Sequence, residues 1–351
     1  MVKQLLTASR IGSYLRCQRQ HYWRYEVGLQ REEASLPLRF GTVWHKAMEE
    51  RSKGLEYTEA LELAMACKDG ATLDEYEAAK IAAMLAGYYA HYGRSGSDDT
   101  VDQLHAEIPF NLPINGSRRF DAAGVIDGLG QFEDGRLCMV EYKTAGESVA
   151  PDAKYWLRLR LNDQVFQYVW SARAVGWDIQ EIVYDVAHKP GIAPKQVADL
   201  DEAGLKIVMD TNTGERVKTK KGWRQSGDKA KGYEVLTHLE TADEYGDRLA
   251  KDIISRPEFY FQRKIYPVLD TDLDEFIAER LVVSRQILCN RRVQKTLDKP
   301  ETAWPRTKGA STCDVMCEFE DFCLVNQSVD LTNPPSGFVV GEIHPELKEG
   351  K

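Results

Sequence analysis

Three residues near the middle of the chain, Asp127, Glu141 and Lys143, have the types and spacing of a metal-dependent hydrolytic site. Two adjacent carboxylates bind hard divalent cations such as Mg²⁺. An ammonium group beside the attacking water can orient it, favour its deprotonated form and offset the charge that builds on phosphorus. The pattern therefore indicates cleavage of a phosphodiester. An aspartate followed by Glu-x-Lys also occurs by chance, as a turn residue and a surface ion pair, so the surrounding elements must decide.

Two strands would have to bring these three side chains together. The apolar residues before Asp127 and Lys143 predict strands over 119–128 and 137–142, with the tight-turn signal Asp134-Gly135 between them. Side chains alternate along a strand, so Glu141 and Lys143 share one face. If the two strands pair as a hairpin, Asp127 lies next to Glu141.

Helices before and after these strands carry further polar residues. His45 follows Gly41 on a helix expected from about 38 to 53. Its neutral imidazole can bind Mn²⁺ or Mg²⁺, although a lone histidine is more often a capped or core residue. Gln164 and Tyr168 are four residues apart on a helix expected over 155–175, and therefore lie on one face. A helix histidine, a strand aspartate, Glu-x-Lys and a helix Gln/Tyr pair in this order are together hard to obtain by chance.

The other patterns predict a chain of mixed α/β type. The segment 7–25 favours a helix capped by Thr7 or Ser9, and alternation favours strands over 104–112 and 179–187. Further helices are expected within 58–92, over 241–255 and over 273–292, with a loop at 93–99. The core order is helix, three strands, helix, strand. A helical insertion at about 55–100 and a basic insertion at about 190–235 interrupt it.

Composition is that of an ordinary globular protein of 351 residues, with 43% hydrophobic and 29% charged side chains. No stretch approaches the roughly 20 apolar residues of a membrane span, and the N-terminus lacks the apolar core of a signal peptide. We therefore expect a cytoplasmic protein with no membrane partner. A net charge of −9 argues against an indiscriminate nucleic-acid coat, so contact with phosphates must rest on local basic patches.

The richest basic run is 217–231, which holds six cations and one acid. Its candidates for contact with DNA are Lys218, Lys220, Lys221 and Arg224. A solvated loop explains the same composition equally well. A smaller basic group consists of Arg291, Arg292 and Lys295.

Seven cysteines are present, and an odd number in a chain without a secretion signal does not suggest a disulfide framework. Cys67, Cys138 and Cys289 lie among apolar neighbours and are expected to be buried thiols. The compact group Cys313-x3-Cys317-x5-Cys323 is one ligand short of a four-ligand site. Cys17 is the candidate for the fourth ligand. Four unpaired buried thiols are the alternative.

The active-site residues resemble the pattern of the PD-(D/E)XK nuclease superfamily. The closest resemblance is to its RecB-like branch, which includes AddB-type nuclease domains, CRISPR-associated RecB-like iron–sulfur exonucleases and phage homologues. The family motifs G-x-x-x-H, G-x-x-D, E-x-K and Q-x-x-x-Y are matched by Gly41/His45, Gly124/Asp127, Glu141/Lys143 and Gln164/Tyr168. The resemblance covers about residues 7–190 and 313–323. It implies a restriction-endonuclease-like core of order αβββαβ, in which helices flank a mixed central sheet.

The resemblance also implies roles for single residues. The ligands of one or two Mg²⁺ or Mn²⁺ ions would be His45, Asp127, Glu141 and the Tyr142 main-chain carbonyl. Lys143 would act on the attacking water. Gln164 and Tyr168 would support the site and contact DNA near the scissile phosphate. Glu107, on the preceding strand, is a further acidic candidate.

AddB-type domains hold a four-iron–four-sulfur cluster with one N-terminal and three C-terminal cysteines. The resemblance implies the same arrangement for Cys17, Cys313, Cys317 and Cys323. Such a clasp would close a loop of about 300 residues and stabilise the fold considerably. The first C-terminal gap has three residues where the family has two, a departure that bears on the cluster geometry. Zinc is the competing metal, since cysteine-rich tetrahedral sites bind it readily.

The sequence thus predicts a single nuclease domain over 1–330, in which the segment 313–323 closes onto Cys17, and a flexible tail over 331–351. The expected activity is that of an exonuclease on single-stranded DNA or DNA ends, in recombination, repair or phage DNA metabolism in a bacterial or phage-infected cell. The alternative is a non-cutting, end-binding iron–sulfur subunit of a repair or CRISPR-adaptation complex. A helicase or recombination partner would be a separate chain, because the sequence has no G-x-x-x-x-G-K-[ST] phosphate loop. The oligomeric state stays open.

Overall fold

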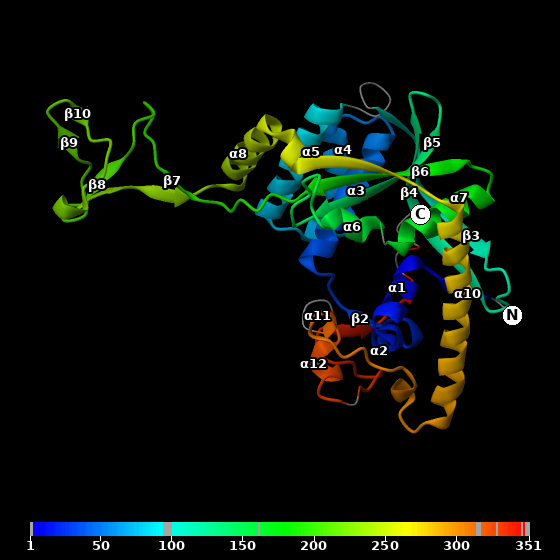
Figure 1. The fold of residues 1–351 in the computed structure, drawn as a ribbon. Coiled ribbons are helices and arrows are strands. Elements are labelled where there is room, and N and C mark those ends of the chain that lie inside the picture. Colours follow the sequence, from blue (N-terminus) through cyan, green and yellow to red (C-terminus); the bar gives the residue numbers. More distant parts are fainter. Residues whose placement is uncertain are drawn as a thin grey trace.

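A six-stranded mixed sheet forms the centre of the molecule in the computed structural model (Figure 1). The structure describes residues 3–93, 100–160, 162–313, 317–327, 329–344 and 347. The sheet order is β1-β4-β5-β6-β13, and β3 also pairs with β4. The strands are β1 (Gln4–Leu6), β3 (Val101–Pro113), β4 (Phe120–Phe132), β5 (Leu137–Ala145), β6 (Ile179–His188) and β13 (Phe261–Pro267).

The pairing is antiparallel for β3 with β4, β4 with β5 and β6 with β13, and parallel for β1 with β4 and β5 with β6. The β4–β5 hairpin turns at Asp134-Gly135, where Gly135 has φ 87°, as the Asp-Gly signal predicts. Its ladder runs from Gln131↔Leu137 to Gly128↔Val140. The two strands separate beyond that last pair, which leaves Asp127 and Glu141 as the first residues of a fork.

One face of the sheet is covered by four helices, α3 (Leu36–Ser52), α4 (Tyr57–Met65), α5 (Glu75–Tyr92) and α8 (Ala242–Ser255). Val140 and Tyr142 of β5 join this hydrophobic cluster. The other face is covered by α6 (Tyr155–Arg160), α7 (Asp163–Ala174) and α10 (Asp270–Val293), and Met139 of β5 packs there. Because side chains alternate, Glu141 and Lys143 share the face of Met139. These layers confirm the predicted mixed sheet flanked by helices.

A third hydrophobic cluster joins the two ends of the chain. The N-terminal part of the cluster comes from α1 (Ala8–Arg16) and the π-helical turn η1 (Tyr22–Glu26), and His21 of the intervening α2 (Gln18–His21) stacks on the Trp304 ring. The C-terminal part comes from Trp304, α12 (Glu320–Cys323) and β14 (Phe338–Val340). Trp23 meets Phe322 edge to face at 5.5 Å between ring centroids, and in Figure 1 the orange α11 (Ala310–Cys313) and α12 lie beside the blue α2.

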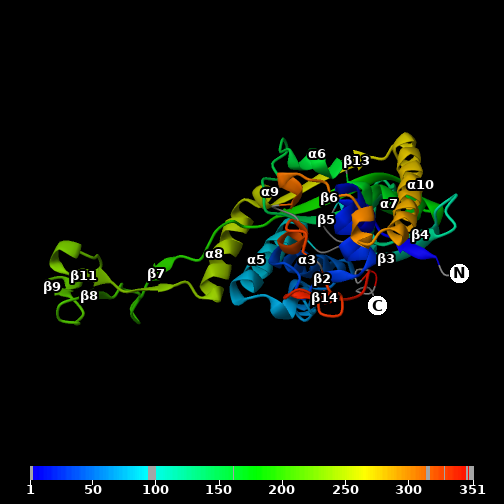
Figure 2. The ribbon, with the colours of Figure 1, turned by 90° about the horizontal axis from the view of Figure 1, so that it is seen from below.

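The predicted basic insertion is a projecting arm (Figures 1 and 2). Its short antiparallel pairs are β7 (Gln196–Ala198) with β12 (Thr237–Leu239), β8 (Val208–Asp210) with β11 (Tyr233–Val235), and β9 (Lys218–Thr219) with β10 (Gly222–Trp223). Trp223 lies between two cations, at 4.3 Å from Arg216 and 4.5 Å from Lys218. The segment thus folds as an extended series of short antiparallel pairs.

Two predicted helices are interrupted. The segment 7–25 does begin at the Thr7 cap, but Cys17 is extended and separates α1 from α2. The cause is tertiary: just beyond this break Arg19 donates to the Trp304 carbonyl at 3.0 Å, and its amide to the Pro305 carbonyl at 3.2 Å. The segment 155–175 is two helices, because the Asn162 side chain accepts from the Gln164 amide at 3.0 Å and caps a new start.

Other sequence predictions were incomplete or wrong. No sequence pattern predicted β1 or β13; β13 is an edge strand with two cations and a terminal proline. Within the tail that was expected to be flexible, β14 pairs with β2 (Leu29–Arg31) and Phe338 is buried. Cys289 is exposed, not buried. Of the expected loop at 93–99, the residues 94–99 lie outside the described part of the chain. Among the described helices, none has the length and apolarity needed to cross a membrane.

Candidate active site

The fork between β4 and β5 meets α3 at a group of three possible metal ligands. Ligand atoms of His45, Glu107 and Asp127 all lie within 4.8 Å of one another. In an octahedral Mg²⁺ shell with bonds of about 2.1 Å, neighbouring ligands are about 3 Å apart and opposite ligands about 4 Å apart. The group is thus compact enough to surround one ion after small side-chain adjustments. Of the two acidic residues expected beside Asp127, Glu107 belongs to this group and Glu141 does not.

Asp127 is held from two sides. Its Oδ2 accepts a hydrogen bond from the Tyr142 amide at 3.2 Å and lies 3.4 Å from His45 Nδ1. The imidazole also has a hydrogen bond with the Tyr142 backbone, which by itself raises its pKa. Burial, followed by the charge of Lys143, outweighs this and lowers the pKa of His45 to about 4. His45 is therefore neutral near pH 7, the form that binds a metal.

Three carboxyls crowd the site, and the pKa of each is raised. Burial is the largest cause for each, and it raises the pKa of Asp127 to about 6. The charge of Asp127 adds to burial for Glu107 and Glu141, and both of these reach a pKa of about 7. Such an accumulation of negative charge is unfavourable by itself and favours binding of a cation.

Glu141 offers the clearest sign of an unsatisfied ligand. The residue is 0% exposed, and its Oε1 accepts from the Lys143 ammonium. Its Oε2 is buried and has no hydrogen-bond partner among the described residues. A buried carboxylate oxygen without a partner is costly, and coordination of a cation would satisfy it. The residues present therefore fit a hard divalent ion.

Lys143 belongs to a chain of polar contacts that runs into α7. The lysine donates to Glu141 and lies 3.4 Å from Gln164 Oε1. The side-chain Nε2 of Gln164 donates to the Tyr168 hydroxyl at 2.7 Å. Burial acts to lower the pKa of Lys143, but the charges of Glu141 and Asp127 outweigh it, so the pKa is raised. Lys143 is an ammonium in this setting, and the Gln/Tyr pair fixes its position.

The glycines of the motifs also have structural reasons. A side chain at Gly124 would come within 2.8 Å of the Phe110 ring and 3.2 Å of Tyr168. A side chain at Gly41 would meet nothing within 4 Å and would extend into the cleft that this residue lines. The cleft is about 460 Å³ in volume, and its wall includes His45, Asp127 and Lys143. Gly124 allows close packing beneath the site, and Gly41 keeps the space above it open.

Glu107 was only a weak sequence candidate, because no sequence pattern reveals its backbone. Its φ of +50° lies in the left-handed region, which glutamate rarely adopts. The β3–β4 ladder pairs Ala106 with Gly128 and Ile108 with Ile126, and Glu107 between them is unpaired. Backbone strain of this kind persists where the surrounding structure requires it, and it concentrates at functional sites. Here it accompanies a carboxylate in the group with Asp127.

The four cysteines of the predicted clasp line a second pocket, of about 480 Å³. Burial is the main cause that raises the pKa of Cys317 to about 11, and the charges of Cys323, Cys17 and Cys313 contribute to this rise. No three of the four sulfurs lie within 4.8 Å of one another among the described residues. Four thiolates on one zinc, with bonds of about 2.3 Å, would lie only about 3.8 Å apart. The observed group is more open than that.

The predicted DNA contacts lie in the projecting arm and not at the fork. Lys218 is on β9, Lys220 and Lys221 form its turn, and Arg224 follows β10. The Arg224 guanidinium already has partners within the arm: it donates to the Ser226 carbonyl at 2.6 Å and lies 3.5 Å from Asp228. The three lysines are exposed. The arm thus presents cations well away from the carboxylates (Figure 1).

Comparison with known proteins identifies a family whose model spans most of the chain. The family model of the PD-(D/E)XK nuclease superfamily matches residues 5–323. No curated protein sequence matches. Among solved structures, the crystal structure of SSO0001 is similar at 10% sequence identity, over 73% of this chain and 77% of that chain, with a TM-score of 0.25.

Proposed function

The chain belongs to the PD-(D/E)XK nuclease superfamily, and we propose that it hydrolyses phosphodiester bonds of DNA at the β4–β5 fork. Membership makes it a metal-dependent nuclease of restriction-endonuclease-like fold. The observation that carries the assignment of the site is a single cleft lined by a neutral histidine, the carboxyls of Glu107 and Asp127 and the half-buried Lys143, which donates to the buried Glu141. A non-cutting end-binding subunit would have no use for this combination.

In the proposed site the metal ligands are His45, Glu107, Asp127, Glu141 and the Tyr142 carbonyl. What Mg²⁺ or Mn²⁺ supplies in such a site is Lewis-acid stabilisation of the phosphoryl charge and a more acidic water. The Lys143 ammonium donates a hydrogen bond to the attacking water or to the phosphoryl oxygens, and stabilises the charge that develops there. Gln164 and Tyr168 position Lys143 through the contacts already described.

The preferred form of the activity is an exonuclease on single strands or DNA ends. Its support is the resemblance of the four motifs to the RecB-like and AddB-like branch, together with a cleft of limited volume. An accessory place in a repair or CRISPR-adaptation assembly, with a separate helicase, is compatible with the same site. The residues 1–330 form a single domain in this proposal.

A four-iron–four-sulfur cluster is the proposed ligand of Cys17, Cys313, Cys317 and Cys323. The shared pocket supports it, and so does the wide spacing of the sulfurs, because each cysteine binds a different iron of a cluster. Arg306 lies in the same pocket and donates to the Cys323 carbonyl at 2.8 Å. Positive charge there offsets the negative charge that four thiolates bring.

The experiment that tests the proposed function uses DNA labelled at the 5′ or the 3′ end, single- or double-stranded, incubated with Mg²⁺ or Mn²⁺. Stepwise shortening from one labelled end is expected for an exonuclease, and discrete internal products for an endonuclease. Asp127→Ala is the matched inactive protein. Absence of any metal-dependent cutting by the natural chain would contradict the proposal.

A further inference from the structure

A cleft outside the carboxylate site is lined by six cations together with polar and apolar residues. It lies between β1, η1 and α10, has a volume of about 870 Å³, and we call it the basic cleft. Its six cations are Lys3, Arg10, Arg119, Arg291, Arg292 and Lys295. Glu26 is the one acid among its described lining residues. This density of positive charge stands out in a chain whose net charge is −9.

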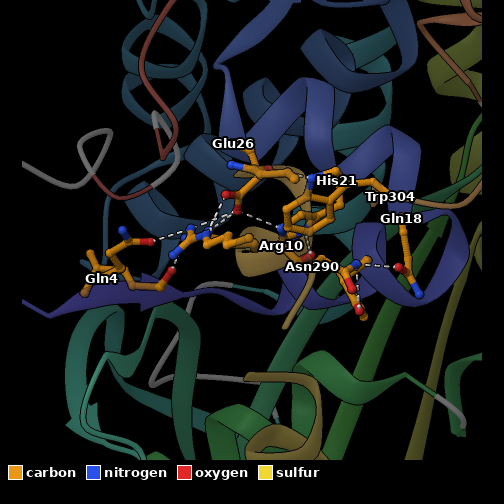
Figure 3. A network of polar contacts seen from close by, with 11 residues as sticks. Gln4, Arg10, Gln18, His21, Glu26, Asn290 and Trp304 are labelled. Atoms are coloured by element: carbon orange, nitrogen blue, oxygen red, sulfur yellow. Dashed lines mark hydrogen bonds and ion pairs between the residues drawn. The ribbon is translucent and has the colours of Figure 1, made fainter. Parts of the chain in front are cut away.

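The floor of the basic cleft is a fixed network around Glu26 (Figure 3). Glu26 Oε1 accepts from Arg10 at 3.0 Å and from Arg291 at 2.8 Å, and Oε2 accepts from Arg291 at 2.6 Å. Burial acts to raise the pKa of Glu26, but hydrogen bonds with His21 and Arg291 outweigh it and lower the pKa to about 2. Burial lowers the pKa of His21 and keeps it neutral. The charges of the network are therefore one carboxylate and two arginines. The floor remains positive.

The rim of the basic cleft holds cations that the protein itself does not use. Arg292 and Lys295 are exposed and have no ion-pair or hydrogen-bond partner for their side chains within the described ranges. Arg292 lies in the last turn of α10 and Lys295 in the turn that follows it, where a cation interacts favourably with the helix dipole. That small effect explains one cation near a helix end, but not six around one cleft. A ligand with several negative charges explains them better.

One hollow lies between the basic cleft and the carboxylate site and shares lining residues with both. The active-site cleft shares Ala8, Ser9 and Gln164 with a hollow beside α1 of about 470 Å³. That hollow also carries Arg16 and Arg24, and it shares Tyr25 with the basic cleft. The lining is therefore continuous around α1, a helix of nine residues and about 14 Å.

We propose that the basic cleft binds the phosphodiester backbone of a single-stranded segment whose scissile phosphate lies at the carboxylate site. This inference rests on the proposed function. A single strand can follow the bend around α1, whereas a duplex, with a persistence length of about 150 base pairs, is too stiff to do so. The cleft then holds the strand by charge and not by sequence, because its side chains offer guanidinium and ammonium groups suited to phosphates.

The test compares two double variants of equal charge change. Arg292→Glu/Lys295→Glu reverses two cations of the basic cleft, and Lys251→Glu/Arg285→Glu reverses two exposed cations outside its lining. Binding of a labelled oligothymidylate on the order of 15 nucleotides long is measured by fluorescence anisotropy with Ca²⁺ in place of Mg²⁺. Melting temperatures of all proteins show that the folds are intact, and all four side chains are exposed. Arg292→Gln/Lys295→Gln repeats the test without adding negative charge.

The cleft variant is expected to bind the strand at least about tenfold more weakly, with a salt dependence reduced by about two counterions. The outside variant is expected to bind as the natural chain does. Equal loss in both variants, or no loss in either, would overturn the inference. A cleft variant that no longer binds inorganic phosphate but still binds the strand as the natural chain does would also overturn the inference. Cutting of labelled DNA by the natural chain is recorded beside these measurements, so an inactive nuclease is distinguished from a wrong binding path.

Discussion

Oδ2 of Asp127 lies 3.4 Å from Nδ1 of His45, and the two residues come from the middle of the central strand β4 and the middle of the covering helix α3. The contact exists because β4 and β5 stop pairing at Gly128↔Val140 and open toward α3. The site is thus made at a defect of the sheet, where backbone groups and carboxylates face a ligand instead of a neighbouring strand.

Removal of either central residue should abolish metal-dependent cutting. Asp127→Ala takes away a carboxylate of the metal group, and Lys143→Ala takes away the ammonium that stabilises charge on the phosphoryl group. We expect a loss of at least about 1000-fold for each, with melting temperatures close to that of the natural chain or higher. Activity retained in both variants would exclude the fork as the cleavage site.

Stability of the metal-free protein should fall as the pH rises from about 4 to 7. The pKa values of Asp127, Glu107 and Glu141 are about 6, 7 and 7, above their ordinary values of 3.8, 4.5 and 4.5. A carboxyl with a higher pKa in the folded state holds more protons there than in the unfolded state, so raising the pH through this window favours unfolding. Mg²⁺ should restore the lost stability above pH 7, by on the order of 5 °C in melting temperature. Scans at pH 5 and pH 8, with Mg²⁺ and with chelator, measure both effects.

Asp127→Asn supplies the control for that pH dependence. It removes one ionising group without changing its size, so the metal-free variant should lose less stability between pH 5 and pH 8. Its gain from Mg²⁺ should be smaller as well. A natural chain whose melting temperature in chelator rises over this range would contradict the assignment.

Glu107 should contribute to metal binding at a cost in backbone strain. Glu107→Ala and Glu107→Gly both remove the carboxylate and should weaken Mg²⁺ binding about tenfold or more in a calorimetric titration. Only glycine adopts a φ of +50° without strain, so Glu107→Gly should be about 1 kcal/mol more stable than Glu107→Ala. Unchanged metal affinity in both would remove Glu107 from the ligand set.

Protein purified without oxygen should be brown, with broad visible absorbance from an iron–sulfur cluster. Cys17→Ala should bleach the colour and lower the melting temperature, because the link between the chain's distant segments is lost. Cys289→Ala is the matched control, since this thiol is exposed and lies outside the pocket. A colourless protein that holds one zinc would decide for the competing metal.

The tip of the arm should contribute charge to DNA binding but not to cleavage chemistry. Replacing Lys218, Lys220 and Lys221 by alanine should weaken binding of long DNA and lower its salt slope by up to about three. The control replaces the exposed lysines Lys68, Lys251 and Lys299. Equal effects of the two triple variants would indicate that the arm is merely a solvated loop.

Sequence patterns predicted the elements that local rules govern. The hairpin turn, the Thr7 cap and the shared face of Glu141 and Lys143 all follow from short-range geometry, and the structure has each of them. The family match extends this to the nuclease class. Local rules do not reach β13 on the sheet edge, the break at Cys17 or the pairing of the tail, because these depend on partners that are distant in the sequence.

The candidate site shows the same division. Motif spacing brought Asp127, Glu141, Lys143, Gln164 and Tyr168 into consideration, and they are in fact neighbours. The position of Glu107 could not be predicted, since it depends on an irregular residue in β3 and not on its neighbours in sequence. In the sequence, the basic cleft could be seen only as the small group Arg291, Arg292 and Lys295, because its other cations are distant from this group along the chain.

The cluster of Trp23 with Phe322 and Phe338 has a consequence for synthesis of the protein. The N-terminal aromatic residues leave the ribosome about 300 residues before their partners, which at 5–20 residues per second is a wait of roughly 15–60 seconds. During that time the sheet and its helices can fold, but the segment around Cys17 keeps an apolar surface without cover. The nascent chain would therefore depend on chaperones for its N-terminal segment, and a metal cluster could form only after Cys323 has been synthesised.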